Sequence, residues 1–338
     1  MTQKILCNIT DDITFISGGN GVNVNLDDLK NPEYIDRIYR IQFNQEPDPK
    51  ILSVVAKIIA ENPHITLRFY GNFPESKIDW DMLHSVERLQ IDLWETKSLK
   101  SISSLTNLVL LSIHKNVKSS VSLKILEPLQ NLEILFTSLS KDVDSLQRIK
   151  NLRFLSLREV KSKNLDFLSY LDRVQELWLS LGSIDDFEGV SKLENLKKLS
   201  LHQVRGLNND SSEKLFTNNN CIQYLQLQNL KHLTKIDFVA KMTNLKYIHL
   251  DGIRNLVSYI PISQNQAIDT ISIAESKPQD KELSYLLNVN NVRLSDSYSK
   301  EIIDLFTQKF KGKSFWYRGN DIIGEIKNSN IRPFELTI

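Results

Sequence analysis

The sequence predicts an α/β solenoid, in which short repeated units stack their strands into a parallel sheet on the concave face. Three observations support this prediction. Apolar residues recur in one fixed pattern, the pattern returns at nearly even intervals, and most segments between its copies have room only for turns or short helices. A repeat array grows in one dimension because each unit packs only on its neighbours. A chain of 338 residues therefore need not divide into two globular domains.

The repeated pattern is an apolar residue, two variable residues, a second apolar residue, one variable residue and a third apolar residue. Its clearest copies are Leu108-Leu111-Ile113, Leu152-Leu155-Leu157, Val174-Leu177-Leu179, Leu196-Leu199-Leu201, Ile222-Leu225-Leu227 and Leu245-Ile248-Leu250. Several copies are preceded by asparagine, as in Asn151-Leu152 and Asn195-Leu196. With the weaker copies included, the middle apolar residue falls at positions 41, 67, 89, 111, 135, 155, 177, 199, 225, 248, 271, 292 and 315. The steps of 20 to 26 residues between these positions are typical of solenoids with one strand per repeat.

This pattern and this period resemble those of leucine-rich repeat proteins of the short class, with about 22 residues per unit. Internalins and regulatory subunits of phosphatases carry such repeats. The resemblance covers roughly residues 35–318 and implies a horseshoe-shaped solenoid that acts as a binding scaffold. The asparagine that such repeats carry three residues after the last leucine is present as Asn116 but is mostly replaced elsewhere. The replacing residues are Val160, Gly182, Val204, Leu230 and Ile253. Backbone groups at those turns must therefore find other partners.

The longer connecting segments carry helix signals. Residues 48–59 begin with Asp48, which can cap a helix, and Pro49, which suits the first helical position, and apolar residues then follow a helical period. Residues 299–310 show the same features, and residues 211–217 and 280–288 are shorter candidates. The central segments are short enough for tight turns or 3₁₀ pieces. We expect helices near the ends of the convex face and thinner turns between them.

The predicted organisation has three parts. Residues 1–34 form an N-terminal cap, residues 35–318 form an array of about thirteen units, and residues 319–338 form a C-terminal cap. An array needs atypical closing segments because its terminal apolar faces would otherwise contact water.

Composition narrows the function classes. The net charge is +1, and sequence-independent nucleic-acid binding usually needs a strongly basic face, so the sequence disfavours a nucleic-acid partner. The N-terminus does not resemble a signal peptide, and no apolar run is long enough for a membrane span. We therefore expect a cytoplasmic protein without a membrane partner. The composition, rich in Lys, Asn and Ile, is typical of an AT-rich bacterial genome.

The residues between the inward apolar positions are expected to line the concave sheet surface, because side chains alternate along a strand. On this surface His114, His202 and His249 fall on the fourth, eighth and tenth strands of the array. Stacked strands lie about 4.8 Å apart, so these histidines cannot share one metal ion. The carboxylates Asp92 and Glu176 are equally dispersed. We therefore expect no catalytic residues, no metal and no cofactor.

Apolar and aromatic residues occupy outward positions in the middle of the array. They are Leu110, Ile134, Phe136, Phe154 and Trp178, followed by Tyr224 and Tyr247. Clustered surface aromatics are typical of interface hot spots, so we interpret this set as a patch that binds a partner. Two alternatives stay open. The side chains can shield one another or lie under a loop, or the fifth strand can shift by one residue and bury Ile134 and Phe136 instead of Thr137.

A second candidate patch is basic. Arg40, Arg68 and Arg88 lie on the first three strands of the array and could receive an acidic segment of a partner or a phosphate. The alternative is that they are solvated charges paired with local acids.

The leading hypothesis is a non-catalytic, monomeric scaffold that binds an unidentified protein through its concave face. One alternative is a secreted or translocated bacterial effector whose repeats select a host target, which a secretion assay would reveal. Another is a glycan-binding module that uses the aromatic residues, which a glycan array would reveal.

Overall fold

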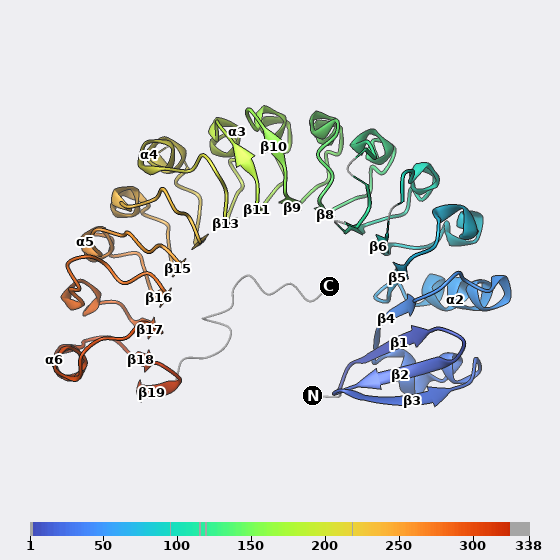
Figure 1. Ribbon diagram of the computed structural model, residues 1–338, viewed down its shortest axis with the longest axis horizontal. Coiled ribbons are helices and arrows are strands. Elements are labelled where there is room, and N and C mark those ends of the chain that lie inside the picture. Colours follow the sequence, from blue (N-terminus) through green and yellow to red (C-terminus); the bar gives the residue numbers. More distant parts are fainter. Residues whose placement is uncertain (1–2, 95, 115, 119, 218, 325–338) are drawn as a thin grey trace. The chain divides into compact units, whose positions relative to one another are not determined.

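The computed structural model describes residues 3–94, 96–114, 116–118, 120–217 and 219–324. The chain divides into two compact units, one ending at Leu157 and the other beginning at Arg158, and each is described by itself. In both units the strands lie on the inner side of the curve, and the helices and turns lie on the outer side (Figure 1).

The first unit contains a sheet that is antiparallel at its beginning and parallel afterwards. Its strands are β1 (Ile5–Ile9), β2 (Ile13–Ser17), β3 (Asn20–Val24), β4 (Ile38–Phe43), β5 (Thr66–Gly71), β6 (Arg88–Leu93), β7 (Leu110–Ile113), β8 (Ile134–Thr137) and β9 (Phe154–Arg158). β2 pairs antiparallel with both β1 and β3. β1 pairs parallel with β4, and each strand from β4 to β9 pairs parallel with the next.

The second unit repeats the parallel arrangement. Its strands are β10 (Lys161–Ser162), β11 (Glu176–Ser180), β12 (Ser183–Ile184), β13 (Lys198–His202), β14 (Tyr224–Gln228), β15 (Tyr247–Asp251), β16 (Thr270–Ala274), β17 (Asn291–Leu294), β18 (Ser314–Tyr317) and β19 (Asn320–Ile323). The strands from β11 to β18, apart from β12, form one parallel sheet. β10 and β12 form a separate two-stranded ladder, and β19 pairs antiparallel with β18.

The predicted inward residues form the core of both units. In the first unit Ile41, Leu67, Leu89, Leu111, Leu135 and Leu155 are paired in register on successive strands. In the second unit Leu177, Leu199, Leu225, Ile248, Ile271, Val292 and Phe315 are paired likewise. All thirteen have 0% exposure. Removing a side chain of this size from water stabilises the fold by roughly 1.5–3 kcal/mol, so this column contributes much of the apolar stabilisation.

The predicted helices are largely confirmed. α2 (Pro49–Glu61) begins after Asp48, whose Oδ1 accepts hydrogen bonds from the backbone nitrogens of Lys50 and Ile51 at 2.8 and 3.1 Å. α6 (Lys300–Lys309) follows Ser299, and α4 covers Asn209–Thr217. The candidate at 280–288 is only a 3₁₀ turn, Ser284–Leu286.

The remaining helices are short, as predicted for the central segments. The α-helices are α1 (Pro32–Ile35), α3 (Glu188–Ser191) and α5 (Ile260–Ser263). The 3₁₀ helices are Asp28–Lys30, Glu75–Lys77, Trp80–Leu83, Lys100–Ser104, Leu123–Leu126, Val143–Arg148, Asp166–Tyr170 and Asp237–Lys241.

Asparagines that precede the strands link neighbouring repeats. In the first unit Asn107 donates from Nδ2 to the carbonyl of His84 at 2.9 Å, and Asn131 donates to Thr106 at 3.0 Å. In the second unit Asn195 donates to the carbonyl of Asp172 at 2.8 Å. Each asparagine thus satisfies a carbonyl of the preceding repeat, which explains why the sequence places asparagine before the first leucine of so many copies.

Backbone hydrogen bonds link neighbouring repeats at the turns where the usual asparagine is missing. In the second unit the residue after each of several strands has a left-handed backbone, with φ between 50° and 66°. These residues are Glu159, Leu181, Gln203, Asn229 and Gly252. Their backbone N–H groups donate to the last carbonyl of the next strand, at 2.7 to 3.0 Å. The backbone itself therefore supplies the partners that we expected it to need.

The ends of the described chain carry antiparallel hairpins, β2–β3 on β1 and β19 on β18. We propose that these hairpins act as the caps expected at residues 1–34 and 319–338. β1 already belongs to the parallel sheet, so the first cap includes one array-like strand. Residues 325–338, which complete the expected C-terminal cap, lie outside the described residues.

We predict that Gly252→Ala destabilises the protein by about 1–2 kcal/mol or more, because the left-handed backbone disfavours any Cβ. A Cβ at this position would also lie 2.3 Å from Asn229 Oδ1. The matched control is Gln203→Ala, since a non-glycine residue already occupies φ 50° there. Urea unfolding measures both variants, and equal losses in the two would contradict this account of the turn.

Candidate binding surface on the strand face

The outward residues of the strands form columns with the registers that the sequence predicted. In the first unit Arg40 pairs with Thr66. The same column continues over successive strands with Arg88, Leu110, Ile134 and Phe154. The fifth strand has the unshifted register. Thr137 points inward with 3% exposure, and its hydroxyl accepts a hydrogen bond from the backbone nitrogen of Leu139 at 3.0 Å. The shifted alternative is therefore wrong.

Arg68 is fixed in place by neighbouring strands. It forms an ion pair with Asp92 on β6 and donates from Nη1 to Gln42 Oε1 on β4 at 2.8 Å. Asp92 is 4% exposed, and it also contacts His114 Nδ1 at 2.9 Å and Asn116 Nδ2 at 2.7 Å. A buried carboxylate with three donors holds its partners in one geometry. Asp92 is thus buried although its position lies on the strand face, and it contacts His114.

Arg40 and Arg88 differ from Arg68 because neither forms an ion pair with a carboxylate in the described part of the chain. The guanidinium of Arg40 lies 5.2 Å from the Tyr39 ring centroid, and its Nε is buried without an acceptor. Burial, together with the nearby charge of Arg68, lowers the pKa of Arg40. Burial also lowers the pKa of Arg88, whose Nε reaches Thr66 Oγ1 at 3.5 Å. Of the three arginines, Arg68 is therefore the one that is paired with an acidic residue in the described part of the chain.

An exposed aromatic pair lies beside this cluster and was missed from the sequence. Trp94 is 43% exposed, and its ring packs edge-on against Tyr70 with centroids 5.8 Å apart. The Tyr70 ring in turn lies 4.7 Å from the guanidinium of Arg68. Trp94 directly follows β6, beyond the columns inspected in the sequence. A tryptophan immediately after a strand on this face is the signal that could have identified it.

The apolar patch of the first unit is less exposed than expected. Leu110 is 1% exposed and Phe154 is 4% exposed, while Ile134 and Phe136 are half-buried. The rings of Phe136 and Phe154 pack with centroids 4.6 Å apart. Leu110 and Phe154 are therefore wrong as exposed anchors, because their neighbours in adjacent columns and strands cover them. The alternative that these side chains shield one another is supported.

The second unit presents a packed polar and aromatic surface. Trp178 is half-buried and donates from Nε1 to Glu176 Oε1 at 2.9 Å, and Glu176 also pairs with Lys198 at 3.3 Å. Burial raises the pKa of Glu176, and the charge of Lys198 opposes this shift. Tyr224 is half-buried and lies 6.4 Å, between ring centroids, from Tyr247.

Tyr247 is only 4% exposed, and burial raises its pKa to about 12. The expectation of an exposed Tyr247 is therefore wrong. The Tyr247 ring instead lies beside the ring of Tyr224.

Asp92 with His114, and the thiol of Cys7, are potentially reactive groups of the first unit. Asp92 orients His114, but His114 makes no hydrogen bond to a hydroxyl or thiol there. Cys7 is 0% exposed, and burial raises its pKa to about 12. No group of three His, Cys, Asp or Glu side chains in this part of the chain is placed to hold a metal ion.

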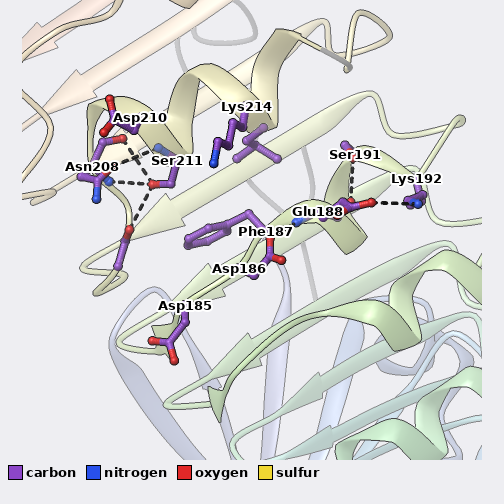
Figure 2. A pocket seen from close by; sticks show the side chains of 12 residues that line it. Asp185, Asp186, Phe187, Glu188, Ser191, Lys192, Asn208, Asp210, Ser211 and Lys214 are labelled. Atoms are coloured by element: carbon purple, nitrogen blue, oxygen red, sulfur yellow. Dashed lines mark hydrogen bonds and ion pairs between the residues drawn. The ribbon is translucent and has the colours of Figure 1, made fainter.

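A groove on the helix side of the second unit is the other candidate site (Figure 2). It has a volume of about 770 Å³ and is lined by residues around α3 and α4. Its polar contacts are those of helix ends: Asp186 accepts from the backbone nitrogen of Glu188 at 2.8 Å, and Asn208 and Ser211 cap each other's backbone nitrogens at 2.9 Å. Glu188 also pairs with Lys192 at 3.0 Å. These contacts stabilise the local fold, so the groove gives weaker grounds for a binding site than the strand face.

Both units are thus parallel solenoids with one main-sheet strand per repeat and a stacked aliphatic core. Solved structures with this architecture include an internalin of Listeria monocytogenes, which is 14% identical, covers 82% of this chain and 91% of that chain, and gives a TM-score of 0.51. TLR13, solved in complex with ssRNA13, is 16% identical with a TM-score of 0.51, and it covers 91% of this chain and 54% of that chain. This chain therefore spans about half the length of TLR13.

The chain has the leucine-rich repeat fold. No protein-family model matches the sequence, and a search of curated proteins gives no significant match.

We predict that the ion pair between Arg68 and Asp92 couples the stability effects of its two residues by about 1–3 kcal/mol, because both side chains are largely removed from water. A double-mutant cycle with Arg68→Gln and Asp92→Asn in urea unfolding measures this coupling. The control cycle uses Arg254 and Glu275, whose side chains are 76% and 66% exposed. That pair should couple by less than about 1 kcal/mol. Equal coupling energies in the two cycles would refute the special role of Asp92.

Proposed function

We propose that this protein is a non-catalytic scaffold that binds another protein through the strand face. In this proposal the protein acts as a monomer in the bacterial cytoplasm. The observation that carries it is the group of Arg68, Tyr70 and Trp94 on the first unit. Tryptophan, tyrosine and arginine are the residue types that most often dominate the energy of protein interfaces.

The rigidity of this group supports a binding role. Asp92 and Gln42 hold Arg68, and Arg68 and Trp94 each contact the ring of Tyr70. Side chains that are already ordered lose less conformational entropy when a partner binds. Trp94 nevertheless keeps 43% of its surface exposed. A partner that covers it would gain apolar burial at little ordering cost.

The second unit offers further contact residues. Trp178 and Tyr224 are half-buried on the strand face, and each has a polar or aromatic neighbour that fixes it. A non-catalytic role is supported by the structural use of Asp92, whose oxygens are taken up by Arg68, His114 and Asn116. None of the helices in the described ranges combines the length and apolar composition that a membrane crossing requires.

A capture experiment with matched variants tests the proposal. Immobilised wild-type protein, Trp94→Ala, Trp178→Ala and Tyr170→Ala are incubated with lysate of the source cells, and bound proteins are quantified by mass spectrometry. Tyr170 is 55% exposed in a 3₁₀ helix on the outer side of the second unit, so it serves as the aromatic control. We expect a specific partner to be enriched by wild type and Tyr170→Ala, and its capture to fall at least about tenfold in Trp94→Ala.

Thermal unfolding of each variant accompanies the capture experiment. Trp94 is well exposed, so its replacement should leave the melting temperature nearly unchanged. Two outcomes would contradict binding through the strand face. One is partner capture that persists when Trp94→Ala and Trp178→Ala are combined, and the other is loss of capture in Tyr170→Ala.

A further inference from the structure

We infer that the basic patch of the first unit, Arg40, Arg68 and Arg88, binds an acidic segment of the partner, with Arg40 and Arg88 each receiving a carboxylate. This inference rests on the proposed function and names the chemistry of the partner. Three features of the patch lead to it: the missing acceptors around Arg40, the excess of positive charge on β4, β5 and β6, and the separation of Arg40 from Arg88.

The first feature is the lack of acceptors around Arg40. A guanidinium carries five N–H donors, yet that of Arg40 makes no hydrogen bond to any residue in the described ranges, and its Nε is buried. A buried donor without an acceptor costs roughly 1–3 kcal/mol. Native proteins seldom leave such a group unsatisfied without a purpose. Burial and the charge of Arg68 both lower the pKa of Arg40, and an incoming anion would oppose both effects by stabilising the charged form.

The second feature is the excess of positive charge on β4, β5 and β6. Asp92 neutralises Arg68 and is itself shared with His114 and Asn116. The charge of the neighbouring Glu87 acts on Arg88, although the described residues show no direct ion pair between the two side chains. Arg40 and Arg88 therefore remain as two charges that Asp92 does not balance.

The third feature is the way these two charges are spaced. Arg40 and Arg88 lie on β4 and β6, two strand steps apart, which is about 10 Å between backbones. The guanidinium of Arg40 turns toward Tyr39 on its own strand, whereas Arg88 reaches toward Thr66 on β5. With backbones two strand steps apart and side chains that contact different neighbours, the two arginines suit two separate carboxylates better than one phosphate group.

Carboxylates on an extended chain fit this spacing. In a polyproline-II-like extended segment, which has three residues per turn and a rise of about 3.1 Å per residue, acidic side chains three residues apart lie on the same side and about 9 Å apart. Arginine binds a carboxylate through two parallel hydrogen bonds, which gives the contact direction as well as strength. Beside the patch, Tyr70 and Trp94 provide the aromatic surface on which apolar residues of the same segment can pack.

The experiment measures binding of a fluorescein-labelled octapeptide of glutamate by fluorescence anisotropy at low salt. We expect Arg40→Gln and Arg88→Gln each to weaken binding about tenfold, since each removes one charge-assisted contact. The matched controls are Lys57→Gln and Lys100→Gln, each of which removes the same net charge as one arginine variant from an exposed position on the helix side of the first unit. Each control should change binding less than about threefold. Equal loss in the controls and in the arginine variants would overturn the inference, because it would show attraction by net charge alone.

Two further arms identify the anion. An octapeptide containing a single phosphoserine among serines should bind at least about tenfold more weakly than the glutamate peptide, since one compact anion cannot reach both arginines; tighter binding of the phosphopeptide would overturn the carboxylate assignment. Arg40→Lys with Arg88→Lys keeps the charge but loses the planar fork, so it should bind the glutamate peptide more weakly than wild type.

The capture experiment separates this inference from the proposed function. If Trp94→Ala abolishes partner capture while Arg40→Gln with Arg88→Gln leaves it unchanged, the scaffold function stands and the acidic-segment inference fails. If the arginine variants lose both the peptide and the partner, and urea unfolding shows that they remain folded, the inference holds.

Discussion

Within each unit the strands of the parallel sheet hydrogen-bond to those of the neighbouring repeats, so the fold depends on every repeat returning the chain to the same register. Within each unit the middle apolar residues meet that condition, because they pair strand to strand and are fully buried. A slip of one residue would turn an inward leucine outward. Asparagine side chains before the strands and left-handed residues after several of them hold the chain to this register from outside the sheet.

The strand positions could be predicted from the sequence because the inward residues are a physical requirement of stacking. Ile41 and Phe315 lie at the weak ends of the pattern, and both were placed correctly. Exposure was harder to predict. Alternation along a strand fixes the direction of a side chain, but its coverage depends on neighbours about 4.8 Å away on other strands. Leu110 and Phe154 point outward and are nevertheless buried for this reason.

The polar contacts of the candidate surface were also beyond sequence analysis. The partners of Arg68 come from β4 and β6, more than twenty residues away in each direction. Its ion pair depends on rotamers that no periodic pattern encodes. Trp94 was overlooked because it lies past the end of its strand, where the regular columns stop. The left-handed turns were hidden as well, since Leu181 and Gln203 are not residues that signal such a conformation.

The left-handed turns have a consequence for how such a chain can grow. The donor and the acceptor of each of these links are backbone atoms, so the turn residue can be leucine, glutamine, asparagine or glycine without losing the bond. A duplicated repeat would bring its own N–H and its own carbonyl, so this link could form again at each new junction. Gene duplication can therefore lengthen this array, while point substitutions of the outward residues change its binding specificity. The length of the array and its specificity can thus evolve separately.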